Sequence, residues 1–137
     1  IQFDSLSFND FGRSDLAGKE ARDQALREKT KKLKIGQVDV FLSHSWHDPA
    51  KPKWRALKAW AARFAAKHGG RSPYLWLDKA CLDQENISKS LVCLPVFLAG
   101  CKTLLVVPGP TYTQRLWCIS MVKMAVLAAP QLATRGS

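Results

Sequence analysis

Three short apolar runs, separated by segments with helical spacing, constrain the fold of this chain more than any other feature. They are Val38–Leu42, Tyr74–Leu77 and Thr103–Val107. Each is rich in β-branched, aromatic or other apolar residues and lacks a regular polar face, which is typical of strands buried on both sides. Alternation of such strands with helices predicts an α/β domain with an open parallel sheet and helices on both faces.

Helical segments are expected before, between and after these strands. The segment between the first two strands shows the spacing best, because Trp54, Leu57, Ala61 and Phe64 recur every three or four residues. The last segment is apolar nearly all round, which predicts burial on more than one side. The expected helices are Ser14 or Asp15 to about Lys34, Lys53–His68, Asn86 or Ser88 to Gly100 with a kink or delayed start at Pro95, and Leu116–Ala129.

Length and composition favour one domain with its own core. The 137 residues divide into an N-terminal, partly helical extension (1–35), an α/β domain (36–130) and a C-terminal tail (131–137). No stretch reaches the roughly 18 to 20 apolar residues that span a bilayer, and the first residues lack a signal-peptide pattern. The four cysteines match no zinc spacing. Reduced, buried thiols in a cytoplasmic protein are therefore expected.

The net charge of +10 is unevenly distributed, because no Asp or Glu follows Glu85. The last 52 residues therefore cannot donate a catalytic carboxylate. The basic segment Arg27–Lys34 has two interpretations. It contacts nucleic acid or anionic lipid, or it supplies favourable charge at a helix C-terminus together with a solvated face.

A polar cluster follows the first strand, where open α/β sheets bind ligands. It comprises Ser43, His44, Ser45, His47 and Asp48, predicted to form a loop. Ser43 and His44 are consecutive, so as strand residues they point to opposite sides and make a poor nucleophile–base pair. His44 and His47 lack a third metal ligand at a convincing spacing. Asp48 is expected to order its loop or to cap the following helix.

The chain resembles the TIR (Toll/interleukin-1 receptor) domain family, in its plant-like and bacterial-like branches. The resemblance covers about residues 38 to 127 and rests on four motifs in the family's order. They are Asp39–Asp48, Leu75–Asp78 followed by Cys81–Ile87, Leu91–Cys101 followed by Leu104–Val107, and Tyr112-Thr-Gln-Arg-Leu-Trp-Cys118. It implies a flavodoxin-like sheet with the strand order 2-1-3 and a polar loop over Asp78–Glu85.

The resemblance also implies a nucleotide pocket and an association surface. The pocket would bind NAD+ as a ligand or substrate through Ser43, His44, Ser45, Asp48, Trp76, Asp78 and Cys81. The association surface would contain Asp83, Gln84, Glu85, Trp117 and Cys118. Met121 occupies the position where NAD-cleaving members carry a catalytic glutamate. A thioether cannot stabilise the positive charge of an oxocarbenium-like sugar, so only Asp78, Asp83, Glu85 or another subunit could supply the acid.

Three functions follow as hypotheses. The chain is a TIR-like signalling and interaction module that needs no cofactor and associates with itself or other TIR domains, an NAD+ glycohydrolase, or a basic nucleic-acid-binding protein. The first is preferred because Met121 replaces the glutamate. The family's two further strands have no counterpart after the last helix. The edge of the third strand is therefore covered by the N-terminal extension, or the chain is a fragment, or it associates.

Overall fold

The computed structural model describes residues 1–12, 18–82 and 86–133. Its centre is a three-stranded parallel sheet in the order β2-β1-β3. The strands are β1 (Val38–His44), β2 (Leu75–Trp76) and β3 (Cys101–Val107). The predicted open parallel α/β sheet and its strand order are therefore confirmed. β1 and β3 run in register from Val38 beside Cys101 to His44 beside Val107.

Helices precede and follow each strand. The α-helices are α1 (Lys19–Glu28), α2 (Ala50–Lys67), α3 (Asp78–Cys81), α4 (Ile87–Val92), α5 (Leu94–Ala99) and α6 (Leu116–Ala133). Three 3-10 turns are η1 (Phe3–Ser5), η2 (Phe8–Phe11) and η3 (Tyr112–Gln114). Pro95 lies in the first turn of α5. The expected kink is therefore a break between α4 and α5, since proline fits a first helical turn but not a helix interior.

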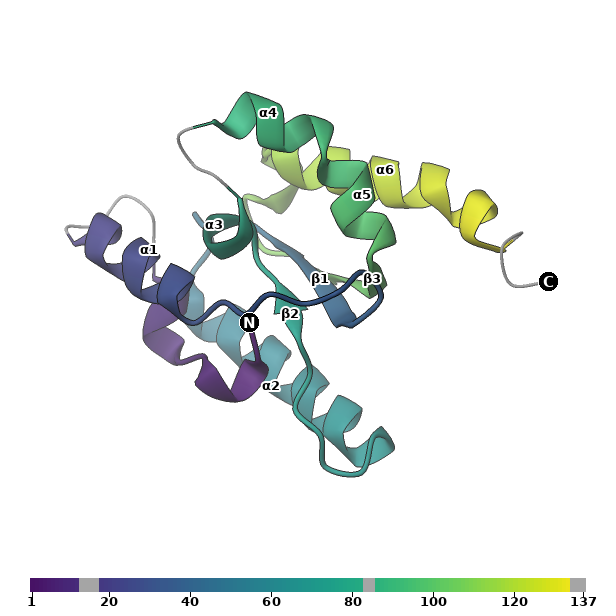
Figure 1. Ribbon diagram of the computed structural model, residues 1–137. Coiled ribbons are helices and arrows are strands. Elements are labelled where there is room, and N and C mark those ends of the chain that lie inside the picture. The colour runs from purple at the N-terminus through teal and green to yellow at the C-terminus, as the bar shows by residue number, and fades with distance from the viewer. Residues whose placement is uncertain (13–17, 83–85, 134–137) are drawn as a thin grey trace.

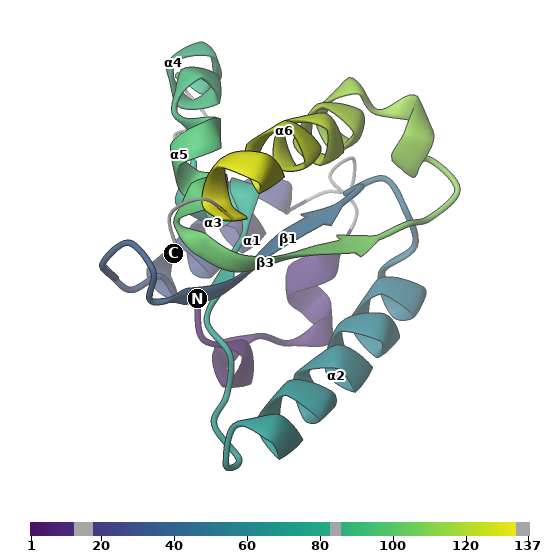
Figure 2. The same cartoon turned by 90° about the vertical axis from the view of Figure 1, so that its right-hand side faces the viewer.

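The helices form a layer on each face of the sheet (Figures 1 and 2). On one face, α2 and the N-terminal segment pack against Val40, Leu42 and Leu75. On the other, α5 and α6 pack against Phe41 and Trp76. Neighbouring strand residues point to opposite faces, which is why Val40 and Phe41 enter different cores. β1 and β2 are buried on both faces, as their apolar sequences predict, whereas the edge strand β3 is only partly buried.

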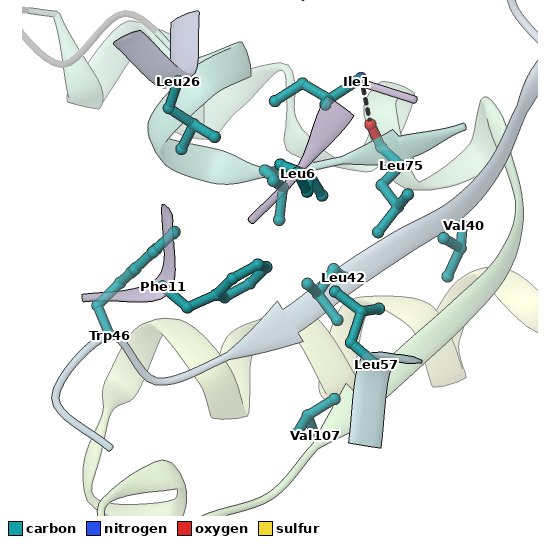
Figure 3. Packing of buried hydrophobic residues seen from close by; sticks show 11 residues of the cluster. Ile1, Leu6, Phe11, Leu26, Val40, Leu42, Trp46, Leu57, Leu75 and Val107 are labelled. Carbon is teal, nitrogen blue, oxygen red and sulfur yellow. Dashed lines mark hydrogen bonds between the residues drawn. The ribbon is translucent and has the colours of Figure 1, made fainter. Parts of the chain in front are cut away.

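The N-terminal segment lies antiparallel beside β2. The backbone nitrogen of Ile1 donates to the oxygen of Leu75 at 2.8 Å (Figure 3), and Gln2 forms a bridge with Tyr74. Phe11 and Leu26 extend this core toward the carboxyl end of the sheet. The extension therefore covers the edge of β2, whereas β3 is the last strand on the other side, with no further strand among the described residues.

Four local predictions differ from the structure. Ser43 and His44 belong to β1 rather than to the following loop. Asp78 begins a short helix where a polar loop was expected. The first helix ends at Glu28 instead of continuing to Lys34. The predicted burial of the last helix is wrong at three positions, because Leu116, Ile119 and Val126 are 80%, 47% and 66% exposed.

The cysteines and the apolar character of the helices can also be compared with the sequence predictions. All four cysteines are free, but Cys93 is exposed and only Cys118 is fully buried. The predicted thiols are therefore free, but their predicted burial is complete only at Cys118, partial at Cys81 and Cys101, and wrong at Cys93. Within the described ranges, none of the helices combines the length and the apolar character needed to cross a membrane.

Candidate functional site

The carboxyl end of β1 is tied to residues 109–118 by hydrogen bonds between side chains. Ser43 Oγ lies 2.8 Å from Tyr112 Oη in a buried pair. Ser45 Oγ lies 2.7 Å from Thr111 Oγ1. These bonds connect the first strand to the segment that leads into α6. Ser43 is therefore held by a tyrosine hydroxyl, and in the described part of the chain no hydrogen bond joins its hydroxyl to a histidine or a carboxylate.

Asp48 is the centre of this connection. Its Oδ1 accepts hydrogen bonds from the backbone nitrogen and the Oγ1 of Thr111, both at 2.8 Å. Its Oδ2 is buried and has no partner in the described part of the chain. A Cβ atom at Gly109 would overlap this carboxylate. Asp48 therefore orders two adjacent loops, as one interpretation of the sequence predicts; α2 has no side-chain cap.

His44 is buried, with 4% of its surface exposed. Its ring makes an edge contact with Trp46, 4.3 Å between centroids, and a tilted one with Phe11 at 5.7 Å. Neither ring nitrogen has a hydrogen-bond partner among the described residues. Burial, reinforced by the nearby charge of Lys53, lowers the pKa of His44 to about 3. The imidazole is therefore neutral at physiological pH and cannot act as a charged acid.

Trp46 connects the first strand to the second. Its indole Nε1 donates to Oδ1 of Asp78 at 2.8 Å, and Lys79 Nζ lies 4.1 Å from the centre of its ring. Lys53 Nζ lies 5.6 Å from the centre of the same ring and donates to the backbone oxygen of Ser45 at 2.9 Å. Burial lowers the pKa of Lys53 to about 8. The tryptophan therefore contacts two cations and one carboxyl group.

A cavity of about 170 Å³ opens at this end of the sheet. The residues that line it are His44, Ser45, Trp46, His47, Asp78, Arg115 and Cys118. At its mouth, Nη2 of Arg115 donates to Nε2 of His47 at 2.7 Å. Burial raises the pKa of Asp78, against hydrogen bonds from Trp46 and from the Lys79 backbone that lower it. Asp78 is therefore the acidic group of this cavity.

The structure brings together only part of the predicted pocket. His44, Ser45 and Asp78 line the cavity, whereas Ser43 and Asp48 lie beside it in the hydrogen-bonded loops. Trp76 stacks on Phe41 in the core, 4.2 Å between centroids. Trp76 and Cys81 line a different cavity at the amino ends of the strands.

Met121 does not line the small cavity either. Its side chain is completely buried, 0% exposed, and belongs to the core between the sheet and α5–α6. The position at which the resemblance implies a catalytic glutamate is therefore part of the hydrophobic core.

The predicted association surface is described in part. Asp83, Gln84 and Glu85, and the side chain of Trp117, lie outside the described part of the structure. Cys118 is buried, 2% exposed, and its thiol is 3.5 Å from the backbone oxygen of His44. Cys118 therefore lies in the interior beside the small cavity and has almost no surface that a partner could contact.

Sequence reasoning missed several residues that shape the site. Thr111 and Tyr112 hold the end of β1, Lys53 holds the Ser45 carbonyl, and Arg115 closes the cavity mouth. Tyr112 and Arg115 do belong to the motif that ends at Cys118, which was the available signal. Nothing in the sequence indicated this role for Lys53, because a lysine on an amphipathic helix is normally exposed to solvent.

The arrangement is a polar, partly closed site at the carboxyl end of an open parallel sheet. Within the described ranges, no group of three or more His, Cys, Asp or Glu side chains could hold a metal ion. The fold therefore places the protein in the class of α/β domains with a flavodoxin-like sheet. No protein-family model, curated protein or solved structure matches the chain significantly.

Proposed function

We propose that the chain is a TIR-like signalling and interaction module, which associates with itself or with other TIR surfaces. The observation that carries this proposal is the outer edge of β3. Among the described residues, β3 pairs with β1 alone, and Leu104, Leu105 and Val106 are half-buried along it. A long apolar edge with unpaired backbone groups is a template for another chain.

The surroundings of this edge support the same function. A groove of about 630 Å³ lies between β3 and α2, and its lining includes Trp60, Leu105 and Val107. α6 leaves Leu116, Ile119 and Val126 exposed. Apolar surface of this kind, gathered on two elements of one domain, marks protein–protein contact sites.

An NAD+ glycohydrolase is the second candidate, favoured by Asp78 in the small cavity. Two observations count against it. The cavity of about 170 Å³ is smaller than the roughly 300 to 1,000 Å³ of small-molecule sites. Met121 is in the core. Release of nicotinamide from NAD+ by the unmodified chain, lost in Asp78→Asn, would favour this candidate over the first. The nucleic-acid hypothesis receives no specific support.

Sedimentation equilibrium of the purified chain tests the interaction module. We expect reversible association at micromolar concentrations, alone or with an added TIR domain. Val106→Lys, which places a charge on the edge strand, should abolish it. Ala62→Lys adds the same charge at an exposed position of α2 away from this edge and should leave association unchanged. A chain that stays monomeric alone and in mixtures with TIR domains would contradict the proposal.

A further inference from the structure

The basic segment after α1 divides into residues that the fold uses and residues that it leaves free. Lys29 forms an ion pair with Asp10 at 2.7 Å. Lys31, Lys32 and Lys34 are exposed, and no ion pair to them occurs among the described residues. A favourable charge at a helix end does not explain these three lysines, because α1 already ends at Glu28.

The three lysines line a cavity of about 500 Å³ at the amino ends of β1 and β3. The rest of its lining is largely apolar and includes Val38, Trp76, Val96 and Phe97. Its volume lies within the range of about 300 to 1,000 Å³ that is usual for small-molecule sites. Ile35, 80% exposed, and Val96, 57% exposed, extend the apolar lining to the surface.

No carboxylate lines this cavity among the described residues. Its two cysteines do not introduce a negative charge either. Burial raises the pKa of Cys81, and it raises the pKa of Cys101 to about 12. The described lining thus combines a largely apolar interior with a basic rim and contains no negative charge.

We infer that this cavity binds an anionic amphiphile, with the apolar chain against Trp76 and Phe97 and a carboxylate or phosphate head group at Lys31, Lys32 and Lys34. A nucleic acid would satisfy the lysines but would leave the apolar interior unfilled. Its lining shares no residue with the cavity at His44 or with the groove beside β3, so the inference does not rest on the proposed association.

Titration calorimetry with dodecanoate tests the inference. We expect saturable binding below the micelle concentration with one site per chain. Octanoate should bind more weakly, by about fourfold for each methylene removed. Dodecyl phosphate should bind as tightly as dodecanoate. Equal affinities would show that the site recognises the negative charge and not a carboxylate in particular. Dodecyltrimethylammonium, with the same chain and a cationic head, should bind about a hundredfold more weakly than dodecanoate, because the attraction of the rim becomes repulsion.

Variants of the rim and the lining separate the two parts of the site. Lys31→Gln, Lys32→Gln and Lys34→Gln combined should weaken dodecanoate binding about tenfold, at roughly 0.5 kcal/mol for each exposed charge. The control replaces three exposed lysines of α2 with glutamine, so that the net charge falls by the same amount. These lysines are Lys51, Lys58 and Lys67. This control should bind as the unmodified chain does.

Val96→Asp places a carboxylate in the lining and should abolish binding. Val92→Asp is its matched control, because Val92 is also exposed, at 80%, but does not line the cavity. Both residues are at the surface, so both variants should fold. Bound dodecanoate should also slow the alkylation of Cys101 but not that of the exposed Cys93.

Three results would overturn the inference. One is dodecyltrimethylammonium binding as tightly as dodecanoate. Another is unchanged dodecanoate affinity in Val96→Asp. The third is tight, strongly salt-dependent binding of an RNA duplex by a chain that does not bind dodecanoate, which would assign the lysines to phosphate-backbone contact.

Discussion

His44 shows how one buried residue couples the stability of this fold to pH. The ring lies between Phe11 and Trp46 and its nitrogens have no partner in the described part of the chain. The folded chain therefore holds the neutral imidazole, with a pKa of about 3, whereas the unfolded chain protonates it near 6.5. Stability contributed by the neutral ring is fully present above pH 6.5 and is lost as the pH falls toward 3.

His44→Phe should remove this pH dependence. Phenylalanine keeps the aromatic contacts and eliminates two buried polar atoms, so the variant should be at least as stable as the unmodified chain at pH 7.5. Between pH 6.5 and 5, urea denaturation should show the unmodified chain losing about 1.4 kcal/mol more per pH unit than the variant. His47→Phe is the control, since His47 lies at the mouth of the cavity. Parallel stability curves for the unmodified chain and His44→Phe would contradict a neutral buried imidazole.

At the scale of elements, the loop that follows β3 is held in place by a carboxylate. Asp48 accepts two hydrogen bonds from Thr111, and its side chain occupies the space beside Gly109. The close approach of the Asp48 side chain requires a glycine at position 109. Backbone conformation does not require it, because the φ angle of Gly109 is not positive. The loop after β1 and the loop after β3 thus form one unit at the mouth of the site.

Gly109→Ala should destabilise the chain by about 1 to 3 kcal/mol, as a methyl group forced into a packed region does. Gly12→Ala is the matched control, because the nearest atoms to a Cβ there lie at 3.4 Å. In the Asp48→Ala background, Gly109→Ala should cost much less, and urea denaturation of the four chains gives the coupling energy. Equal costs in both backgrounds would show that Asp48 is not what excludes the methyl group.

The elements themselves could be predicted well where local pattern determines them. Strands without a polar face, such as Thr103–Val107, were found from their pattern, although β3 begins two residues earlier, at Cys101. Their order in the sheet came from the resemblance and not from local pattern. The exposed apolar residues of α6 could not be predicted, because periodicity does not show how many neighbours a helix has. The same limit applies to Ser43 and His44, which tertiary hydrogen bonds and packing hold in β1.

At the scale of the whole molecule, the two ends of the sheet have different chemistry. The carboxyl end holds a small polar cavity, and the amino end holds a larger apolar one with a basic rim. The resemblance implied a pocket that contains His44 and Asp78, and both residues line one cavity, because the carboxyl ends of parallel strands lie at the same edge. It placed Trp76 there too, but Trp76 faces the core with Phe41. Which face a residue of a two-residue strand takes depends on register, which the sequence does not reveal.

Met121 belongs to the hydrophobic core of the domain, at the position where the resemblance implies a catalytic glutamate. Its side chain packs with Phe41, Trp76 and Leu94, all nearly or fully buried. A glutamate at this position would place a carboxylate among apolar side chains, without a cationic partner among the described residues of this core. The geometry therefore opposes the restoration of a catalytic acid by a single substitution.

Met121→Glu should destabilise the chain by about 3 to 5 kcal/mol at pH 7, which is typical of an uncompensated buried charge. Met121→Leu, which conserves volume, should cost less than about 1.5 kcal/mol. The buried carboxyl should have a raised pKa, so the variant's deficit in urea denaturation should shrink as the pH falls from 7 to about 5. Neither variant should release nicotinamide from NAD+. A Met121→Glu chain that is as stable as Met121→Leu and cleaves NAD+ would show that this position faces the site, and the interaction module would then be a disabled enzyme.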